Sequence, residues 1–529
     1  MKNVVISFLI CSLSLSSCGD DDDTSGNGGN SDLTKNVTVN TTAMFQTIDG
    51  FAASDCWTVN YIGKYWDVNQ KESMARLLFS KEIKNGRPEG IGLSMWRFNL
   101  GAGTAEQGEN SGIEDKSRRS ECFLNADGTF DWMRQEGQQY FLDKAREYGC
   151  ESFVMFSNSP PVYYTYNGKG YSARGSFSNL KEEHYTDFAG YMAEVAAYFK
   201  QNKNILFNYI SPVNEPQYNW NEPSQEGSGW QNSEIKQLVT ELDKALTGHD
   251  LDSKILITEA GDWEYLYQVK NGAGRSNQID DFFSTGSGNY IGNLKHVAPL
   301  IGGHSYWTDG NWNTLSQVRI QLAAKASIYG LKIYQTEWSM LGDHFNDRAY
   351  PGHESSSYHD IALYMAQVMH HDLTTANVSS WSYWTSMDVS RWNHKNRFLL
   401  IELNPAGGAY GDISGSGTHQ ATKTLWVLGN YSLFVRPGYQ RVDLRIGNPS
   451  NSFFGSAWLS PEKDRLTVVY TNLTTKSIEV KLDIEGMSKN YISKKKYTTS
   501  QTKDLKEEIS DERDCIIDPE SVTTIVYQF

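Results

Sequence analysis

In the segment ILFNYISPVNEPQYNW, residues 205–220, an apolar run of strand character ends in a carboxylate. Its first half carries Leu, Phe, Tyr and Ile, as a buried strand does. The strand ladder must then stop, since Pro216 has no N–H to donate. An amide and an acid, Asn214 and Glu215, are therefore presented at the edge of a sheet. The same residues also suit the start of a helix, where Asn and Glu precede a proline, so the rest of the chain must decide between the two interpretations.

Seven further apolar runs of strand length occur along the chain, and longer helical or loop segments separate them. They lie at 47–55, 92–101, 152–161, 254–261, 300–307, 332–339 and 379–386. Helical patterns precede four of the eight strands, at 184–202, 233–248, 317–330 and 358–374. Strands that alternate with helices predict a parallel sheet. Eight such units fit an α/β chain of the (β/α)8 TIM-barrel type better than an open doubly wound sheet.

The character of the sequence changes after Trp384. A Gly- and Ser-rich stretch at 404–419 is followed by short alternating runs, as in RLTVVYTNL and SVTTIVYQF, which are typical of antiparallel strands. The early stretch 35–48 alternates in the same way. A chain of 529 residues exceeds one ordinary core. We therefore predict a catalytic barrel over 49–425, and an all-β sandwich built from 426–529 together with an N-terminal strand at 35–48.

The N-terminal residues 1–18 have the features of a lipoprotein signal peptide. Lys2 precedes the apolar run VVISFLICSLSLSS, which is too short to span a membrane. The run closes in LSSC, which resembles the lipobox of bacterial lipoproteins and implies that Cys18 is lipidated. An ordinary signal peptide with an incidental cysteine is the alternative. Residues 19–34 are acidic and Gly-rich, so we expect a solvated tether.

The localisation and the partners follow from the leader and the charge. The acid run after Cys18 resembles signals that send lipoproteins to the outer face of the outer membrane; the periplasmic face is the alternative. A net charge of −15 disfavours nucleic acid as a partner, because phosphate contacts need Lys and Arg. We expect a monomer that meets the membrane only through its lipid anchor.

The cysteines and histidines give no sign of a metal centre. Beyond the leader and Cys18, four cysteines remain, and neither C-x-x-C nor H-x-x-x-H occurs. An oxidising compartment would permit disulfides, but spacing alone cannot give their pairing. Buried free thiols are the simpler interpretation. The four are Cys56, Cys122, Cys150 and Cys515.

Polar and aromatic residues gather where a barrel carries its function, at the C-terminal ends of the strands. Core packing does not require such a set, and its repetition along the chain favours an enzyme. The residues at these ends are Asp55, Arg97, Asn99, Asn158, Asn214, Glu215, Glu259, His304, Tyr306, Glu337, Trp338 and Trp384.

Glu215 and Glu337 are the candidate catalytic pair. They close the fourth and seventh strands, which we expect to face each other across the barrel mouth. Two carboxylates on opposite walls of a cleft suit the cleavage of a glycosidic bond. One donates a proton to the leaving oxygen, and the other meets the positive charge that develops at the anomeric carbon.

The motifs around these two acids resemble those of a known family. QTIDGFAASDCW, FSNSPP, SPVNEPQ, HSYW, YQTEWS and GNYSLFVRPGYQRVD are similar to glycoside hydrolase family 30, and closest to its endo-β-1,6-galactanase-like branch. The resemblance implies a retaining mechanism without metal or cofactor, with Glu215 as acid/base and Glu337 as nucleophile. It covers nearly all of the mature chain.

The resemblance also implies substrate-binding roles for other residues at the strand ends. Asn214 is expected to bond the sugar 2-hydroxyl, and Trp384 to form the floor under the reacting sugar. Asp55 and Asn158 are expected to bind substrate hydroxyls.

Three residues are expected to support the nucleophile. Arg97 would orient Glu337 through a charge-assisted hydrogen bond, or form a structural ion pair instead. Tyr306 would bond the same carboxylate, and His304 would line that wall. Family 30 gives the fifth strand no catalytic carboxylate, so Glu259 is expected to be a binding or structural acid.

The sequence departs from the family pattern at two places that shape the substrate cleft. Residues 158–165 carry tyrosines where a tryptophan is common in the family, and the stretch 105–123 is a long polar insertion. Other activities of the family therefore remain open, namely β-glucosidase, β-xylosidase or xylanase. A non-catalytic glycan-binding lipoprotein is a further alternative, but such a protein would have no reason to keep both glutamates.

Overall fold

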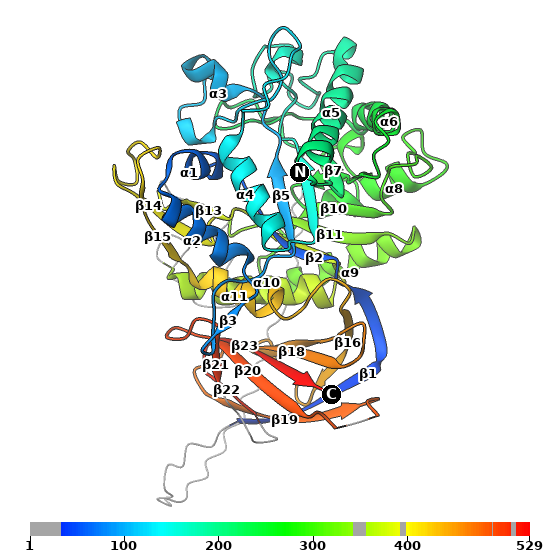
Figure 1. The fold of residues 1–529 in the computed structure, drawn as a ribbon. Helices are drawn as coiled ribbons and strands as arrows, with labels where there is room; N and C mark the ends of the chain where they lie inside the picture. The colour runs from blue at the N-terminus through cyan, green and yellow to red at the C-terminus, as the bar shows by residue number, and fades with distance from the viewer. Residues whose placement is uncertain (1–32, 342–355, 392–397, 489, 509–514) are drawn as a thin grey trace, which may run out of the picture.

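The computed structural model describes residues 33–341, 356–391, 398–488, 490–508 and 515–529. Figure 1 shows two bodies, a barrel surrounded by helices and, below it, a body made of strands. The predicted signal peptide, Cys18 and most of the tether lie outside the described residues.

Parallel strands form the barrel in the order β8-β7-β6-β5-β2-β12-β11-β10-β9. Because β8 and β9 are two halves of the fifth predicted strand, the two ends of this order meet and the sheet closes. Each observed strand falls inside a predicted run, and the (β/α)8 prediction is confirmed. The strands are β2 (Gly50–Ser54), β5 (Met95–Asn99), β6 (Ser152–Phe156), β7 (Tyr209–Ser211), β8 (Lys254–Ile255), β9 (Thr258–Ala260), β10 (Leu300–His304), β11 (Lys332–Trp338) and β12 (Ser380–Tyr383).

The main helices pack around the outside of this barrel (Figure 1). Capping residues set where several of them begin: Gln231 with Glu234 forms a capping box at α6, and Ser357 with Asp360 forms one at α10. The barrel helices are α1 (Val59–Tyr65), α2 (Val68–Phe79), α4 (Glu136–Glu147), α5 (Tyr185–Lys203), α6 (Asn232–Gly248), α8 (Gln278–Phe283), α9 (Trp312–Ile328) and α10 (Tyr358–Thr374).

Short elements lie in the loops between the strands and the helices. The insertion at 105–123 contains most of α3 (Thr104–Gln107), and also η1 (Gly108–Ser111) and η2 (Lys116–Arg118). The other short elements are β3 (Ile83–Lys84), β4 (Arg87–Pro88), η3 (Val162–Tyr164), η4 (Glu182–His184), α7 (Glu264–Tyr267) and η5 (Ala273–Arg275).

The second body is a nine-stranded sheet in the order β21-β20-β23-β18-β17-β16-β1-β19-β22. Side chains of β1 and β19 share one buried core with side chains of β18 and β23, although these pairs are far apart in the strand order. The sheet therefore curls over and packs against itself as a sandwich. Its strands are β1 (Leu33–Thr47), β16 (Gln440–Ile446), β17 (Phe453–Leu459), β18 (Arg465–Asn472), β19 (Ile478–Glu485), β20 (Ser493–Thr499), β21 (Lys506–Glu508), β22 (Cys515–Ile517) and β23 (Ser521–Gln528).

The N-terminal strand joins the sandwich, and it starts earlier than the tether prediction placed it. β1 lies between β16, to which it is antiparallel, and β19, to which it is parallel. Leu33 and Thr34 already pair with Ile478 and Glu479, so they belong to the strand.

The predicted boundary between residues 425 and 426 falls inside a helix, α11 (Lys423–Ser432). Asn430 of this helix bonds Tyr497 and Thr524 of the sandwich, while Ser432 bonds Ile91 on the barrel side. α11 therefore joins the two bodies, and the sandwich strands resume only at β16. The Gly- and Ser-rich stretch before it contributes to a small sheet of β13 (Met387–Val389), β14 (Ile401–Pro405) and β15 (Gly417–Ala421).

The four cysteines of the described chain, Cys56, Cys122, Cys150 and Cys515, are buried and free. None of the described helices has both the length and the apolar character needed to cross a bilayer.

Candidate active site

Glu215 is placed by the turn that follows β7. Its backbone lies in the left-handed region, with φ +42°, and its N–H donates to the carbonyl of Glu259 at 2.8 Å. A Cβ added at Gly261 would lie 2.7 Å from Glu215 Oε1, so only glycine leaves room for this carboxylate. Gly261, which follows β9 and has no side chain, therefore leaves the space that the Glu215 carboxylate occupies.

Glu337 lies near the C-terminal end of β11, where two donors hold its carboxylate. Arg97 donates from Nη1 to Oε2 at 2.7 Å, and the Tyr306 hydroxyl donates to Oε1 at 3.0 Å. Arg97 also donates from Nη2 to Asn214 Oδ1 at 3.1 Å. One buried guanidinium thus sets the positions of two predicted site residues.

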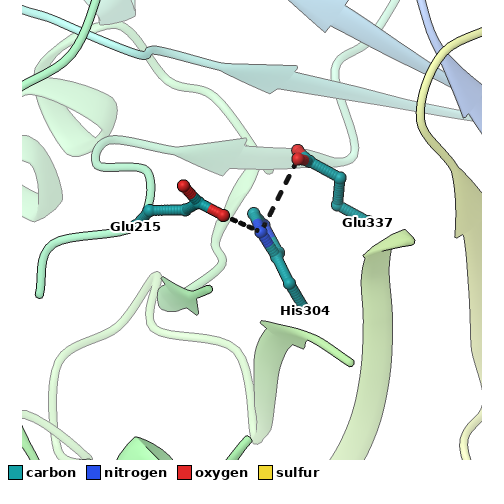
Figure 2. Close-up of side chains that lie close together, drawn as sticks. All are labelled: Glu215, His304 and Glu337. Carbon is teal, nitrogen blue, oxygen red and sulfur yellow. Dashed lines mark hydrogen bonds and ion pairs between the residues drawn. The ribbon is translucent and has the colours of Figure 1, made fainter. Parts of the chain in front are cut away.

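His304 stands between the two carboxylates (Figure 2). Its Nδ1 lies 2.9 Å from Glu215 Oε1 and 3.7 Å from Glu337 Oε1, and its Nε2 lies 3.3 Å from Glu259 Oε2. The imidazole is fully buried. Three carboxylates therefore surround one histidine ring.

The charges of this cluster balance one another. Burial opposes protonation of His304, but Glu337, Glu215 and Glu259 outweigh it and raise its pKa to about 9. Burial likewise opposes ionisation of Glu259, yet Arg97 and His304 lower its pKa to about 2. Thr336 also donates a hydrogen bond to Glu259. Glu259 is thus a buried structural anion.

The pKa of Glu337 is raised by its burial, while His304 and Arg97 oppose the rise by favouring the carboxylate. An oxygen of Glu215 and an oxygen of Glu337 lie within 4.8 Å of each other. Carboxyl groups about 5–5.5 Å apart are typical of double displacement, whereas inverting enzymes separate theirs by about 6.5–9.5 Å.

A cavity of about 190 Å³ opens over the two acids. Asn214, Tyr306 and Trp384 line it together with Glu215 and Glu337. Trp384 packs edge-on against Trp57, with ring centroids 5.0 Å apart. Arg118 joins this cavity to a larger one of about 760 Å³, because it lines both.

Four predicted site residues do not line the cavity. Arg97 and His304 lie behind the carboxylates that they contact. Asp55 is fully buried and accepts from Asn99 N at 2.7 Å and Gln138 Nε2 at 3.1 Å, and its burial raises its pKa to about 7. Asn158 donates to Asn99 Oδ1 at 3.1 Å. In this structure Asp55 and Asn158 support the loops under the site and present no group to the cavity.

The structure adds cavity residues that the sequence reasoning did not single out. The sequence could have indicated two of them as site residues, because Trp57 stands in the ASDCW motif and Trp220 closes the segment that follows Glu215. Arg118 lies in the insertion that was expected to shape the cleft. Of the others, Thr385 follows Trp384 in the run 379–386, Asp388 lies on β13, and Gln225, Leu341 and Phe398 lie in loops. The added residues are Trp57, Arg118, Trp220, Gln225, Leu341, Thr385, Asp388 and Phe398.

Glu215, His304 and Glu337 are also the group whose donor atoms lie close enough to hold a metal ion among the described residues. A histidine binds metals through a neutral imidazole, and the carboxylates around His304 keep it protonated at neutral pH. Arg97 already neutralises Glu337. The arrangement therefore suits proton transfer and nucleophilic attack better than metal binding.

Comparison with known proteins decides the family. The model of O-glycosyl hydrolase family 30 matches residues 34–399. The chain belongs to this family.

Relatives of the chain agree with that assignment. An endo-β-1,6-galactanase of Hypocrea rufa is 23% identical over 421 residues, which cover 76% of this chain and 75% of the relative. An exported protein of Bacteroides fragilis has a solved structure with TM-score 0.85 and 30% identity, covering 93% of this chain and 99% of the other. The fold is shared with the catalytic domain of a family 30 xylanase from Talaromyces cellulolyticus, with TM-score 0.65 and 18% identity over 93% and 100% of the two chains. The family 30 chain described here is thus an O-glycosyl hydrolase.

The protonated His304 should make the stability of this family 30 enzyme depend on pH. Its folded pKa of about 9 lies above the ordinary 6.5, so its contribution is complete below pH 6.5 and is lost as the pH rises through 9. The loss amounts to about 3 kcal/mol. We expect the thermal midpoint of the native enzyme to fall over this interval, and that of His304→Gln to fall much less.

His419→Gln is the matched control. Burial lowers the pKa of His419, so its replacement should leave the fall in thermal midpoint between pH 6.5 and 9 in place. Equal pH slopes for the native enzyme and His304→Gln would contradict the charged state assigned to His304.

Proposed function

We propose that this protein is a retaining β-glycoside hydrolase that cleaves extracellular polysaccharide inside the chain, with β-1,6-linked galactan as its substrate. The observation that carries the proposal is the approach of Glu215 and Glu337 within 4.8 Å at the mouth of the barrel. Such a pair spans one glycosidic bond, with a proton donor on one side and a nucleophile on the other.

In the first step, Glu337 attacks the anomeric carbon while Glu215 gives its proton to the departing oxygen. Arg97 and Tyr306 hold the Glu337 carboxylate during the attack. In the second step, Glu215 takes a proton from water, and the resulting hydroxide equivalent displaces Glu337 from the sugar. The positive charge of His304 lies beside both acids and stabilises whichever of them is ionised.

Asn214 and Trp384 are the proposed contacts of the reacting sugar. The Oδ1 of Asn214 accepts from Arg97, which turns its amide N–H₂ toward the cavity for a sugar hydroxyl. The Trp384 ring lines the same cavity and offers an apolar face.

The choice of galactan is supported by similarity to the Hypocrea rufa enzyme, whose description is endo-β-1,6-galactanase. Xylanase, β-xylosidase and β-glucosidase activities are the alternatives within the family. A cavity of about 760 Å³ beside the catalytic one supports binding of a longer chain, and hence internal cleavage. A non-catalytic glycan-binding role does not account for the three donors aimed at the two acids.

The leader supports a location at the outer membrane. We propose that Cys18 carries the lipid anchor, and that the tether holds a monomeric enzyme at the cell surface. Similarity to an exported Bacteroides fragilis protein supports export. The sandwich, joined to the barrel through α11, would then stand between tether and barrel, because β1 follows the tether directly.

A fluorosugar with a reactive leaving group tests the mechanism. A 2-deoxy-2-fluoro-galactobioside should inactivate the enzyme and add its sugar to the peptide that contains Glu337, as read by mass spectrometry. Glu215→Ala should still be labelled, since a reactive leaving group needs no proton, while its galactan activity falls at least about 100-fold. Label on any other residue, or no label in the native enzyme, would contradict the assignment.

A panel of polysaccharides tests the substrate. We expect β-1,6-galactan to be cleaved at least about 100-fold faster than xylan or β-1,6-glucan, and its early products to be oligosaccharides of mixed length. Release of single sugars alone would refute internal cleavage, and a preference for xylan would select the xylanase alternative.

The lipid anchor is tested on the native chain in its own cell. Cys18→Ala should abolish incorporation of labelled palmitate and move the protein from the membrane fraction to the soluble fraction. Unchanged fractionation would contradict the anchor, while leaving the enzymatic assignment intact.

A further inference from the structure

Three aromatic side chains form a continuous ridge beside the acid Glu215: Trp220, Tyr218 and Trp307. The rings of Tyr218 and Trp220 meet with centroids 5.7 Å apart, and Trp307 Nε1 donates to the Tyr218 hydroxyl at 2.9 Å. Trp220 lines the catalytic cavity at one end. The aromatic ridge therefore leads from the cavity outward to the surface.

The ridge contacts the backbone of Glu215 and continues from the end of β10, the strand that carries His304. Trp220 donates from Nε1 to the carbonyl of Glu215 at 3.1 Å. A Cβ added at Gly261 would meet the Glu215 carboxyl and the Tyr218 ring at nearly the same distance, 2.7 and 2.9 Å, so the two lie against one point of the backbone. Trp307 follows β10, three residues after His304. The ridge is thus positioned by the same elements that position the proton donor.

The side chains at the outer end of the ridge are exposed to solvent, and the backbone of Trp307 has an unfavourable conformation. Trp307 is 44% exposed and Tyr218 is 38% exposed, which leaves a contiguous apolar surface in water. The backbone of Trp307 has φ +61°, a left-handed conformation that bulky residues rarely adopt. That of Trp220 has φ +51°. The ring of Trp307 remains in contact with solvent.

The chemistry of the site fixes which part of the substrate lies here. The acid of a retaining glycosidase protonates the oxygen of the departing sugar, so that sugar must lie on the side of the acid. Glu337, the nucleophile, lies across the cavity. A surface anchored to Glu215 is therefore on the leaving-group side of the scissile bond.

We propose that the aromatic ridge binds the sugar unit on the leaving-group side, a neutral hexopyranose whose apolar C–H face packs on the Trp307 ring. This inference rests on the proposed function and extends it. An aromatic ring supplies a large contact area at small cost in side-chain entropy, and sugars present an apolar face of similar size. The ridge accordingly favours bonds within a chain, and it also holds an acceptor sugar that competes with water for the glycosyl-enzyme.

Two substrates that differ only in their leaving group test the ridge. β-1,6-Galactotetraose places sugar on the ridge, whereas β-1,6-galactobiosyl fluoride loses only fluoride. We expect Trp307→Ala to lower the ratio of kcat/KM for the tetraose to kcat/KM for the fluoride by about ten-fold. Trp307→Phe, which retains a ring, should recover most of that ratio.

The rate at which trapped enzyme is reactivated gives a second measurement. Its dependence on the acceptor would not change if Trp307 had only a structural role. The 2-fluoro-galactobiosyl enzyme turns over by reaction with water, or with added galactobiose bound at the ridge. In Trp307→Ala the acceptor-dependent rate should fall about ten-fold relative to the water rate. Phe45→Ala is the matched control, because Phe45 is 43% exposed but lies on β1 of the sandwich; both ratios should stay at the native value.

The outcomes separate this inference from the proposed function. If the native enzyme cleaves the fluoride and forms the trapped species, but Trp307→Ala keeps both ratios within two-fold of native, the ridge does not bind the leaving sugar. If the native enzyme does neither, the proposed function itself fails, and the role of the ridge fails with it.

Discussion

Two buried cations, Arg97 and His304, hold three carboxylates together at one end of the barrel. Arg97 contacts Glu337 and lies 3.6 Å from Glu259, and His304 contacts Glu215 and Glu259 from the other side. Carboxylates packed this closely repel one another, and the two cations offset that repulsion. Removing one partner from a buried cluster leaves the remaining charges uncompensated. The spacing that the chemistry requires therefore depends on groups that never reach the substrate.

The barrel makes this cluster possible, because its members come from strands that are distant in sequence. Arg97 belongs to β5, His304 to β10 and Glu337 to β11, while Glu215 follows β7. The fifth strand contributes the carbonyl that fixes the Glu215 backbone and the bare surface of Gly261 under its carboxyl. Loops then shape the cleft: Arg118 lines both the catalytic cavity and the larger one, and Trp220, Tyr218 and Trp307 extend the site on the side of the acid. The catalytic groups thus lie on barrel strands or shortly after their C-terminal ends, and the loops beyond them line the cleft.

Much of this arrangement follows from sequence patterns. All eight strands lie within predicted runs because parallel strands are buried on both faces and read as continuous apolar segments. Glu215 and Glu337 stood out because each ends such a run. What a pattern cannot give is the direction of a side chain at a strand end. Asp55 and Asn158 end strands in the same way, yet they turn inward to bond Asn99 and Gln138. The place of His304 between the acids depends on three strands at once, and the pattern of one strand does not contain it. Likewise α11 was not anticipated, because it is buried against both bodies, packing on α10 of the barrel and on β20 and β23 of the sandwich.

We propose that Glu337, and then a water molecule activated by Glu215, displace at one anomeric carbon in succession, which preserves its configuration. The most direct measurement is the anomeric configuration of the first product, followed by proton NMR during the first minutes of hydrolysis of a β-1,6-galactooligosaccharide. We expect the β-anomer of the new reducing end to form first, and mutarotation then to produce the α-anomer. Initial formation of the α-anomer would show a single displacement by water, and the close approach of Glu215 and Glu337 would then need another explanation.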